Sequence, residues 1–255
     1  MNVFKKILLK VEGVQKTIFF GMPDTENELK EMYKLRYRVY VEKQKYIPVT
    51  DQQNGSEVDE YDRNNFCHYF IARIDDRIIG STRMIRHSPL PIEKDYFAFE
   101  TPLKVRDIPK DKMVEIGRLI STKYSKDVYL PRHLVLLGLL SSMIEFGIQK
   151  GYMGGYGAIK EKGKKALQAL NVPIHDIENA KIIYDPETSH DPLSNFFGDS
   201  TNPVHPIYYV GEELQKYLDN ILNNKFMFKR IDKDTFLFKN MFLMKMWHTL
   251  NNLFR

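Results

Sequence analysis

The sequence contains a single cysteine, Cys67, among its 255 residues. One cysteine cannot form an intramolecular disulfide, which excludes a disulfide-stabilised secreted domain and fits a reducing compartment such as the cytosol. Because Cys67 lies within the apolar run 66–70, we interpret it as a small buried core residue and not as a nucleophile.

Long hydrophobic runs are also missing. A helix that spans a bilayer needs roughly 20 predominantly apolar residues, and the longest candidate, 134–146, is shorter and contains Glu145. We therefore predict a cytoplasmic protein that is soluble or, as an alternative, peripheral on the inner face of the membrane.

Motifs for metals and nucleotides are absent as well. The seven histidines are dispersed, without the His-x-x-x-His or Cys-x-x-Cys spacing of a metal site. The sequence has no phosphate-binding loop of the GxxxxGK[ST] type and no nucleophilic serine motif. These absences predict an activity that uses neither a metal ion nor a permanently bound cofactor.

The net charge of +5 is concentrated in one part of the chain. Residues 223–255 contain seven basic and two acidic side chains, so residues 1–222 are neutral overall. A nucleic-acid-binding domain is expected to carry its positive face on the folded body, and we predict no nucleic-acid partner. We divide the chain into a domain, 1–222, and a C-terminal extension, 223–255, which is also rich in aromatic residues. The extension either contacts a membrane interface, through a segment such as 236–255, or packs on the body or a second subunit.

Apolar periodicity and turn residues predict the order of the elements. Strands are expected at 17–20, 66–74, 78–85, 113–120, 152–159 and 206–210. Helices are expected at 25–43, 131–150, 160–170 and 212–222. This order predicts an α+β fold whose mostly antiparallel central sheet is flanked by helices, with one parallel pair where the long helix crosses between strands.

Two charged residues, Glu115 and Arg118, interrupt the apolar strand 113–120. A buried charge is costly unless it is paired. Residues three apart point to opposite faces of a regular strand, but Gly117 between them is a favourable bulge position that would redirect one side chain. A distorted strand also exposes backbone N–H groups that can hold an oxyanion. The alternative is a buried Arg–Glu pair with a structural role only.

Three other groups of charged or aromatic residues accompany this strand. Arg36, Arg38 and Tyr40 lie on the first helix, an acidic run occupies 59–62, and Arg83 lies in the neighbouring hairpin strand. Taken singly, helix arginines usually extend to solvent and acidic loops are usually solvated.

The order and spacing of four runs resemble a known family. The runs 33–36, 57–62, 80–83 and 115–119 look like the autoinducer-synthase-like acyltransferases, which include acyl-homoserine-lactone synthases and long-chain N-acyl amino acid synthases. The resemblance covers roughly residues 17–220. It implies the GNAT (N-acetyltransferase-like, or acyl-CoA N-acyltransferase) fold and an acyltransferase activity.

The resemblance also implies roles for individual residues. Those that match the charged positions of the family pattern are Arg36, Asp59, Asp62, Arg83, Glu115 and Arg118. Tyr40 stands where the family has an aromatic residue, and Tyr46 stands where lactone synthases usually carry tryptophan. In the family these residues order a loop over the active site and shape the amine pocket, while the glutamate assists deprotonation of the amine. We expect Arg36 and Arg118 to be tied to Asp59 and Asp62.

The family commonly takes its acyl group from an acyl carrier protein. No glycine-rich pyrophosphate loop precedes the long helix, since 121–127 reads STKYSKD, which favours a carrier-protein thioester, with acyl-CoA as the second donor. The backbone N–H groups near Leu119, Ile120 and Ser121 are expected to hold the oxyanion. Carrier-protein contacts are expected at Lys123, Lys126 and Arg132, unless these residues belong to an ordinary solvated loop.

Within the family, lactone synthases usually have serine at the position of Gly117. Gly117 and Leu119 look more like the N-acyl amino acid synthases. The sequence therefore predicts transfer of a fatty-acyl group to the amine of an amino acid or a related small amine. Two alternatives stay open: a lactone synthase that uses S-adenosylmethionine, and a non-catalytic module that binds a lipid or carrier protein.

Overall fold

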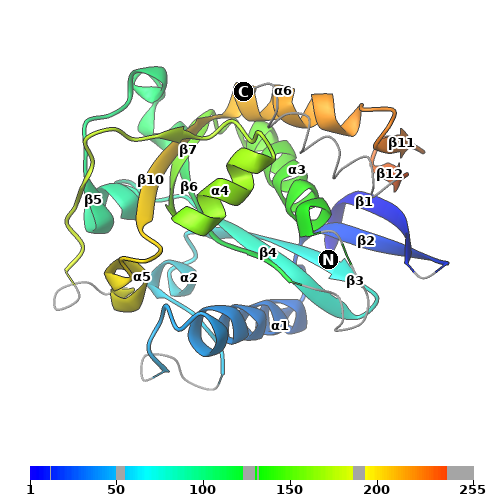
Figure 1. Cartoon of the computed structure of the whole chain (residues 1–255), viewed down its shortest axis with the longest axis horizontal. Coiled ribbons are helices and arrows are strands. Elements are labelled where there is room, and N and C mark those ends of the chain that lie inside the picture. Colours follow the sequence, from blue (N-terminus) through cyan, green and yellow to red (C-terminus); the bar gives the residue numbers. More distant parts are fainter. Residues whose placement is uncertain (12, 50–54, 123–129, 131, 186–192, 240–255) are drawn as a thin grey trace.

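The computed structural model describes residues 1–11, 13–49, 55–122, 130, 132–185 and 193–239. A ten-stranded sheet with the strand order β11-β12-β1-β2-β3-β4-β6-β7-β10-β8 forms the centre of the molecule (Figure 1). Its neighbouring strands are antiparallel, except that β1 pairs with β12, and β6 with β7, in parallel. This mixed, mostly antiparallel sheet confirms the predicted fold class.

The strands of this sheet are β1 (Asn2–Val11), β2 (Val14–Met22), β3 (Cys67–Ile74), β4 (Arg77–Ile85), β6 (Met113–Ser121), β7 (Gly154–Lys160), β8 (His175–Asp176), β10 (Val204–Val210), β11 (Phe228–Arg230) and β12 (Thr235–Phe238). A small second sheet pairs β5 (Phe97–Ala98) with β9 (Lys181–Ile182). The α-helices are α1 (Glu26–Tyr37), α2 (Glu60–Arg63), α3 (Arg132–Lys150), α4 (Glu161–Ala169), α5 (Ser194–Gly198) and α6 (Gly211–Leu222). Short π-helical turns lie at Arg38–Lys43 and Ile92–Tyr96, and 3-10 turns at Leu103–Val105 and Lys110–Lys112.

Helix α3 covers one face of the sheet, packing on β1, β2, β3, β4 and β6. Most of its side chains are apolar, and it is buried along most of its length. A Cβ at Gly138 would lie 2.3 Å from the ring of Phe20, so only glycine lets α3 approach β2 this closely. The predicted long helix and its place between β6 and β7 are confirmed.

Helix α1 covers the opposite face, where it packs on β4. Its first turn is capped by Thr25, whose hydroxyl accepts a hydrogen bond from the backbone N–H of Glu28 at 3.2 Å. The helix was predicted to run to about residue 43. The chain does stay helical to Lys43, but the last six residues form a π-helix, and this change of winding carries Tyr40 towards β6.

Strands β1, β11 and β12 were not predicted. In β1 the exposed Lys6 and Lys10 alternate with Ile7 and Leu9, which are in the core, and this is the period of a strand with one buried face. Strand β12 adds to its edge in parallel, and Phe236 and Phe238 of β12 are buried.

The described part of the C-terminal extension therefore packs on the body. Most of the segment considered for membrane contact, residues 240–255, lies outside the described residues. The division of the chain at residue 222 stays a prediction.

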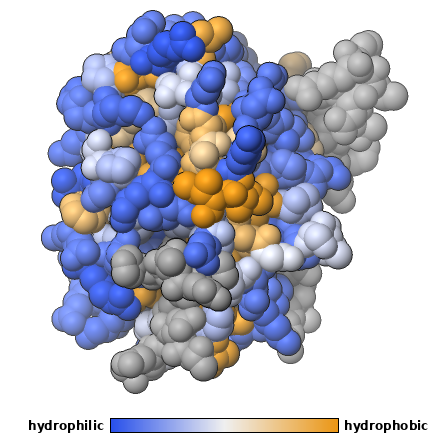
Figure 2. Space-filling view, turned by 90° about the vertical axis from the view of Figure 1, so that its left-hand side faces the viewer, coloured by the Kyte–Doolittle hydropathy of each residue, from blue (hydrophilic) through white to orange (hydrophobic). Residues whose placement is uncertain are grey.

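Within the described residues no helix has the length and hydropathy to cross a membrane. The face near β5 and α5 is mainly hydrophilic, with apolar side chains gathered near its centre (Figure 2).

Strands β6 and β7 pair along only part of their length. Their register runs from Met113 opposite Gly154 to Glu115 opposite Tyr156, although β6 continues to Ser121 and β7 to Lys160. A Cβ at Gly155 would lie 1.9 Å from the carbonyl oxygen of Val114, so glycine is required for the close approach. Beyond Glu115 the two strands diverge.

A bulge distorts β6 just past this point. Between the pairs Ser81–Ile120 and Arg83–Gly117, β4 advances two residues while β6 advances three. The predicted bulge is confirmed, but the left-handed backbone belongs to Arg118, with φ of 52°, and not to Gly117. Because a non-glycine residue rarely adopts this conformation, the surroundings of Arg118 must hold it there.

Candidate active site

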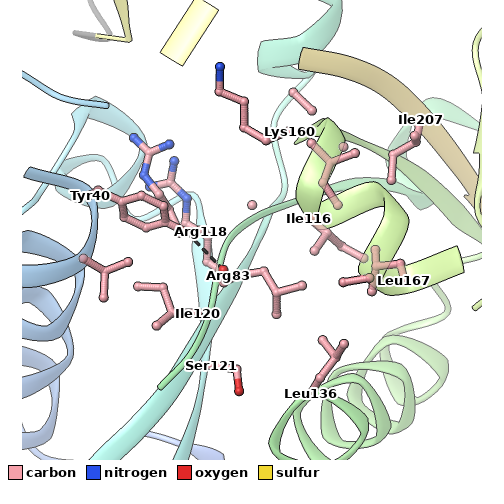
Figure 3. Close-up of a pocket in the computed structure, with 18 of the residues that line it drawn as sticks. Tyr40, Arg83, Ile116, Arg118, Ile120, Ser121, Leu136, Lys160, Leu167 and Ile207 are labelled. Carbon is pink, nitrogen blue, oxygen red and sulfur yellow. Dashed lines mark hydrogen bonds between the residues drawn. The ribbon is translucent and has the colours of Figure 1, made fainter. Parts of the chain in front are cut away.

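A cavity of about 950 Å³ opens where β6 and β7 diverge. Apolar side chains from α3, α4, β6 and β10 line one half of it, among them Leu136, Leu140, Leu167 and Ile207. The other half holds polar and charged side chains together with a few apolar ones such as Ile120 (Figure 3). Figure 3 shows this division, with Tyr40 and Arg118 on one side and Leu136 and Leu167 on the other.

Glu115 lies in the wall of this cavity at the last β6–β7 pair. Its side chain is buried, and its Oε2 accepts a hydrogen bond from the backbone N–H of Ile92 at 2.7 Å. A carboxylate held by a backbone donor keeps a fixed orientation. Glu115 is thus a buried acidic group at the point where the strands separate.

Three arginines and three carboxylates form a buried network beside Glu115. Each arginine binds two of the carboxylates: Arg36 binds Glu57 and Asp62, Arg83 binds Asp59 and Asp62, and Arg118 binds Glu57 and Asp59. The charges of the six groups sum to zero. Charge-assisted hydrogen bonds of this kind are the strong ones in proteins, so the network ties α1, the loop 55–62, β4 and β6 together.

The sequence anticipated this network in part. The expected pairs Arg36–Asp62 and Arg118–Asp59 are present, with nitrogen–oxygen distances of 2.8 and 3.2 Å. Glu57 was not singled out, yet it is fully buried and binds two of the arginines. Nothing local in the sequence distinguishes Glu57 from the partly exposed Glu60 in the same acidic loop.

The carboxylates also shape their own loop. Asp59 caps helix α2, accepting a hydrogen bond from the N–H of Asp62, while the Asp62 side chain accepts one from the N–H of Asp59. This capping box orients both side chains towards the arginines. Tyr69 adds a further hydrogen bond to Asp62 at 3.0 Å.

The electrostatics of the network favour its charged form. Burial raises the pKa of Glu57, but Arg118 and Arg36 outweigh burial and lower this pKa to about 2. Burial also opposes ionisation of Asp62, and Arg36 and Arg83 hold the pKa of that carboxyl well below its usual range. Glu57 and Asp62 are therefore ionised at neutral pH.

Tyr40 and Tyr46 line the polar half of the cavity. The hydroxyl of Tyr40 donates to the carbonyl oxygen of Leu119 at 3.2 Å, and the guanidinium of Arg118 lies 5.7 Å from the centre of its ring. Burial raises the pKa of Tyr40, so the hydroxyl stays protonated. These contacts brace the bulge in β6, which accounts for the backbone conformation of Arg118.

The three residues expected to supply oxyanion donors lie on the diverging part of β6 and line the cavity. The N–H of Thr122 donates to Ile79 in β4, so strand alternation directs the backbone of Ile120 towards β4 and that of Ser121 towards the β7 side. Of the residues expected to contact a carrier protein, Lys123 and Lys126 lie outside the described residues. Arg132 begins α3, and its side chain is not described either.

Lys160 also lines the cavity, and it was not identified from the sequence as a candidate site residue. It ends β7, is only 6% exposed, and its Nζ lies 5.4 Å from the ring centre of Tyr46 and 5.1 Å from that of Phe196. A lysine at a strand end is ordinarily exposed. Its burial depends on aromatic residues distant in sequence, so no local pattern reveals it.

The comparison with known protein families gives the class of the chain, an acyltransferase. The autoinducer synthase family model matches residues 23–187, and the chain belongs to this family. This assignment confirms the resemblance seen in the four sequence runs.

Solved structures of the same class share the fold. The crystal structure of the AHL synthase LasI is 14% identical, with a TM-score of 0.55, covering 80% of this chain and 94% of that chain. The CoA-dependent acyl-homoserine lactone synthase BjaI, solved with SAM and isopentyl-CoA, is 16% identical, with a TM-score of 0.51, covering 88% and 92%. No curated protein sequence matches the chain significantly.

Proposed function

We propose that the protein transfers a fatty-acyl group from a thioester to the amine of an amino acid or a related small amine. The main support for this proposal is the cavity between β6 and β7, at the point where the two strands diverge. The cavity has an apolar half and a charged half, and Glu115 lies at the last β6–β7 pair. An acyl chain suits the first half and a polar amine the second. The membership of the autoinducer synthase family supports the acyltransferase class.

In the proposed reaction the neutral amine attacks the thioester carbonyl carbon. The C–N bond forms and the C–S bond breaks, and the leaving thiolate takes up the proton that the amine has given to Glu115, which restores the carboxylate. Glu115 accepts the proton that the amine loses, directly or through water, as a general base. Backbone N–H groups of the diverging part of β6, near Leu119 and Ser121, stabilise the oxyanion.

The arginine–carboxylate network has a positioning role in this proposal. It fixes the loop 55–62 against the sheet and holds Arg118 beside Tyr40. Correct placement of two reactants supplies a large part of the rate enhancement of many enzymes. None of the network carboxylates is proposed as the base, because arginines already occupy all three.

The size of the cavity supports a long acyl chain. Ligand pockets usually have volumes of roughly 300–1,000 Å³, and the volume of about 950 Å³ is near the upper end. The apolar half extends from β6 towards α3 and α6, where Leu136 and Leu214 line it. We propose an acyl carrier protein as the donor and partner, with acyl-CoA as the second donor, and a cytoplasmic location where both occur.

A lactone synthase is the second candidate, favoured by the family assignment and by the fold shared with LasI and BjaI. In that reaction the acylated amine belongs to S-adenosylmethionine, and a second step closes the lactone. Gly117 favours the first candidate.

The two candidates are separated by a reaction with purified components. The protein is incubated with a long-chain acyl carrier protein or acyl-CoA, together with either a mixture of amino acids or S-adenosylmethionine. Mass spectrometry then identifies the products. We expect an N-acyl amino acid. An acyl-homoserine lactone establishes the second candidate, and free fatty acid as the only product contradicts both.

A further inference from the structure

The Lys160 ammonium is buried without a hydrogen-bond partner among the described residues. The carboxylate of Asp199 lies near it, but the Nζ–Oδ2 distance of 3.8 Å is longer than a hydrogen bond. The rings of Tyr46 and Phe196 stack against the ammonium but cannot accept its protons as an oxygen does. A buried donor without an acceptor is destabilising, so the folded protein keeps an unsatisfied cation in the cavity wall.

Burial lowers the pKa of Lys160, while Asp199 acts in the opposite direction. The ammonium is still the expected form at neutral pH, because an unperturbed lysine has a pKa of about 10.4. A buried charge without a partner is unfavourable, and an anion that enters the site and pairs with the ammonium removes part of that cost.

The other buried cations around the cavity are already neutralised. Arg36, Arg83 and Arg118 each bind two carboxylates, and the network has no net charge. A substrate anion would have to break these pairs to bind an arginine. Lys160 requires no such exchange, since Asp199 is about one-third exposed and only loosely associated with it.

Lys160 and Glu115 emerge on the same face of the sheet. Glu115 pairs with Tyr156 in the β6–β7 register, and Tyr156 and Lys160 are four residues apart on β7, so their side chains point to one face. Their Cα positions are about 13 Å apart along the strand axis, so the two long side chains must extend towards each other for one amino acid to bind to both. Their side chains line one cavity, which therefore has a negative group at the divergence of the strands and a positive group farther along β7.

We infer that Lys160 binds the carboxylate of the amine acceptor and makes the enzyme select substrates that carry both an α-amine and a carboxylate. This inference rests on the proposed acyl transfer to an amine. Glu115 is placed for the amine of such a substrate and Lys160 for its carboxylate. Tyr46 and Phe196 hold the lysine stem in place, while Figure 3 shows Lys160 apart from the apolar residues Leu136 and Leu167.

The test compares two acceptors and three variants. The acceptors are an amino acid that the wild type acylates and the carboxamide of the same amino acid, which keeps the amine and the side chain but lacks the negative charge. The variants are Lys160→Met, Lys160→Arg and the control Lys165→Met, which removes an equal charge from an exposed site on α4. Thermal unfolding of each variant establishes that it is folded, and Lys160→Gln replaces Lys160→Met if the latter is not.

We expect Lys160→Met to lower kcat/KM for the amino acid at least tenfold, mainly through KM, and to change kcat/KM for the carboxamide less than twofold. Lys160→Arg retains part of the preference, and Lys165→Met changes neither substrate. An equal loss on both acceptors shows a structural role for Lys160 and overturns the inference.

The anion could instead be a phosphate of the donor. Acyl-CoA and the acyl thioester of N-acetylcysteamine, which lacks phosphate, distinguish the two sources. A loss confined to acyl-CoA overturns the carboxylate assignment. If the wild-type protein acylates the amino acid and its carboxamide equally well, the role of Lys160 is contradicted and the proposed acyl transfer is not. If the wild-type protein acylates no amine, both proposals are contradicted.

Discussion

Two groups of buried charges border the cavity, and they differ in how they are neutralised. The network of Arg36, Arg83 and Arg118 with three carboxylates satisfies its own charges. Glu115 is held by a backbone N–H, and Lys160 has an ammonium without a hydrogen-bond partner among the described residues. Charges that neutralise one another stabilise structure, whereas charges that face a cavity are available to a substrate. The first group therefore positions the site, and the second is proposed to act on the reactants.

The largest effect on stability is expected from Glu57→Gln. Removing one partner from a buried ionic network leaves an uncompensated charge, at a cost of about 3–5 kcal/mol. Glu57 is fully buried and binds both Arg36 and Arg118. Urea unfolding measures the change, with Glu60→Gln as the control in the same loop. If Glu57→Gln lowers the free energy of unfolding by less than 1 kcal/mol, the arginine–carboxylate network does not stabilise the fold as proposed.

Acid is expected to weaken the same network. The pKa of Glu57 in the folded protein is about 2, below its ordinary value of 4.5. A carboxyl group with a lowered pKa contributes stability that is complete above the unfolded value and is lost as the pH falls towards the folded value. The free energy of unfolding should therefore decrease between about pH 5 and pH 2, with a shallower slope in Glu57→Gln. Equal slopes in the two proteins contradict this assignment.

The apolar half is tested by Leu136→Trp. Leu136 is buried on α3 and lines the half proposed for the acyl chain (Figure 3). The larger side chain should shorten the accepted chain and lower kcat/KM for a long-chain donor about tenfold or more relative to a short-chain donor. The short-chain donor serves as the internal control. Equal losses on the two donors would place the acyl chain elsewhere.

The smallest effect is expected from Tyr40→Phe, which removes one hydrogen bond to the carbonyl oxygen of Leu119. A hydrogen bond of this kind contributes about 1 kcal/mol. The free energy of unfolding and the activation free energy of the reaction should each change by about that amount. The change stays small because the ring still packs against Arg118. A loss as large as that of Glu57→Gln would mean that the Tyr40 hydroxyl does more than brace the bulge.

Much of the fold could be predicted from local signals. The hairpin of β3 and β4, the strand β6 and the helix α3 have strong apolar periodicity and clear end signals, and the structure has all of them. Strand β1 alternates as well, but lysines interrupt its apolar residues, and no strand was predicted there. Strands β11 and β12 are only three and four residues long, and β12 depends on the edge of β1 for its pairing while β11 pairs with β12.

The site was predictable where charge interrupts an apolar strand, as at Glu115 and Arg118. The partners of these charges were harder to assign, because Arg118 binds Glu57 across 61 residues of sequence. The conformation of Arg118 could not be foreseen either. Glycine at position 117 suggested where the bulge lies, while the contacts of Tyr40 and the carboxylates decide which residue takes the left-handed backbone.

The central claim is that Glu115 takes the proton of the attacking amine, and Glu115→Gln tests it most directly. The rate of N-acyl product formation is measured by mass spectrometry under saturating donor, beside thermal unfolding of the same preparation. Loss of a general base typically lowers the rate by about 10²–10⁴-fold. We predict a loss of at least a hundredfold in a variant that remains folded. A folded Glu115→Gln protein with undiminished product formation would contradict the account.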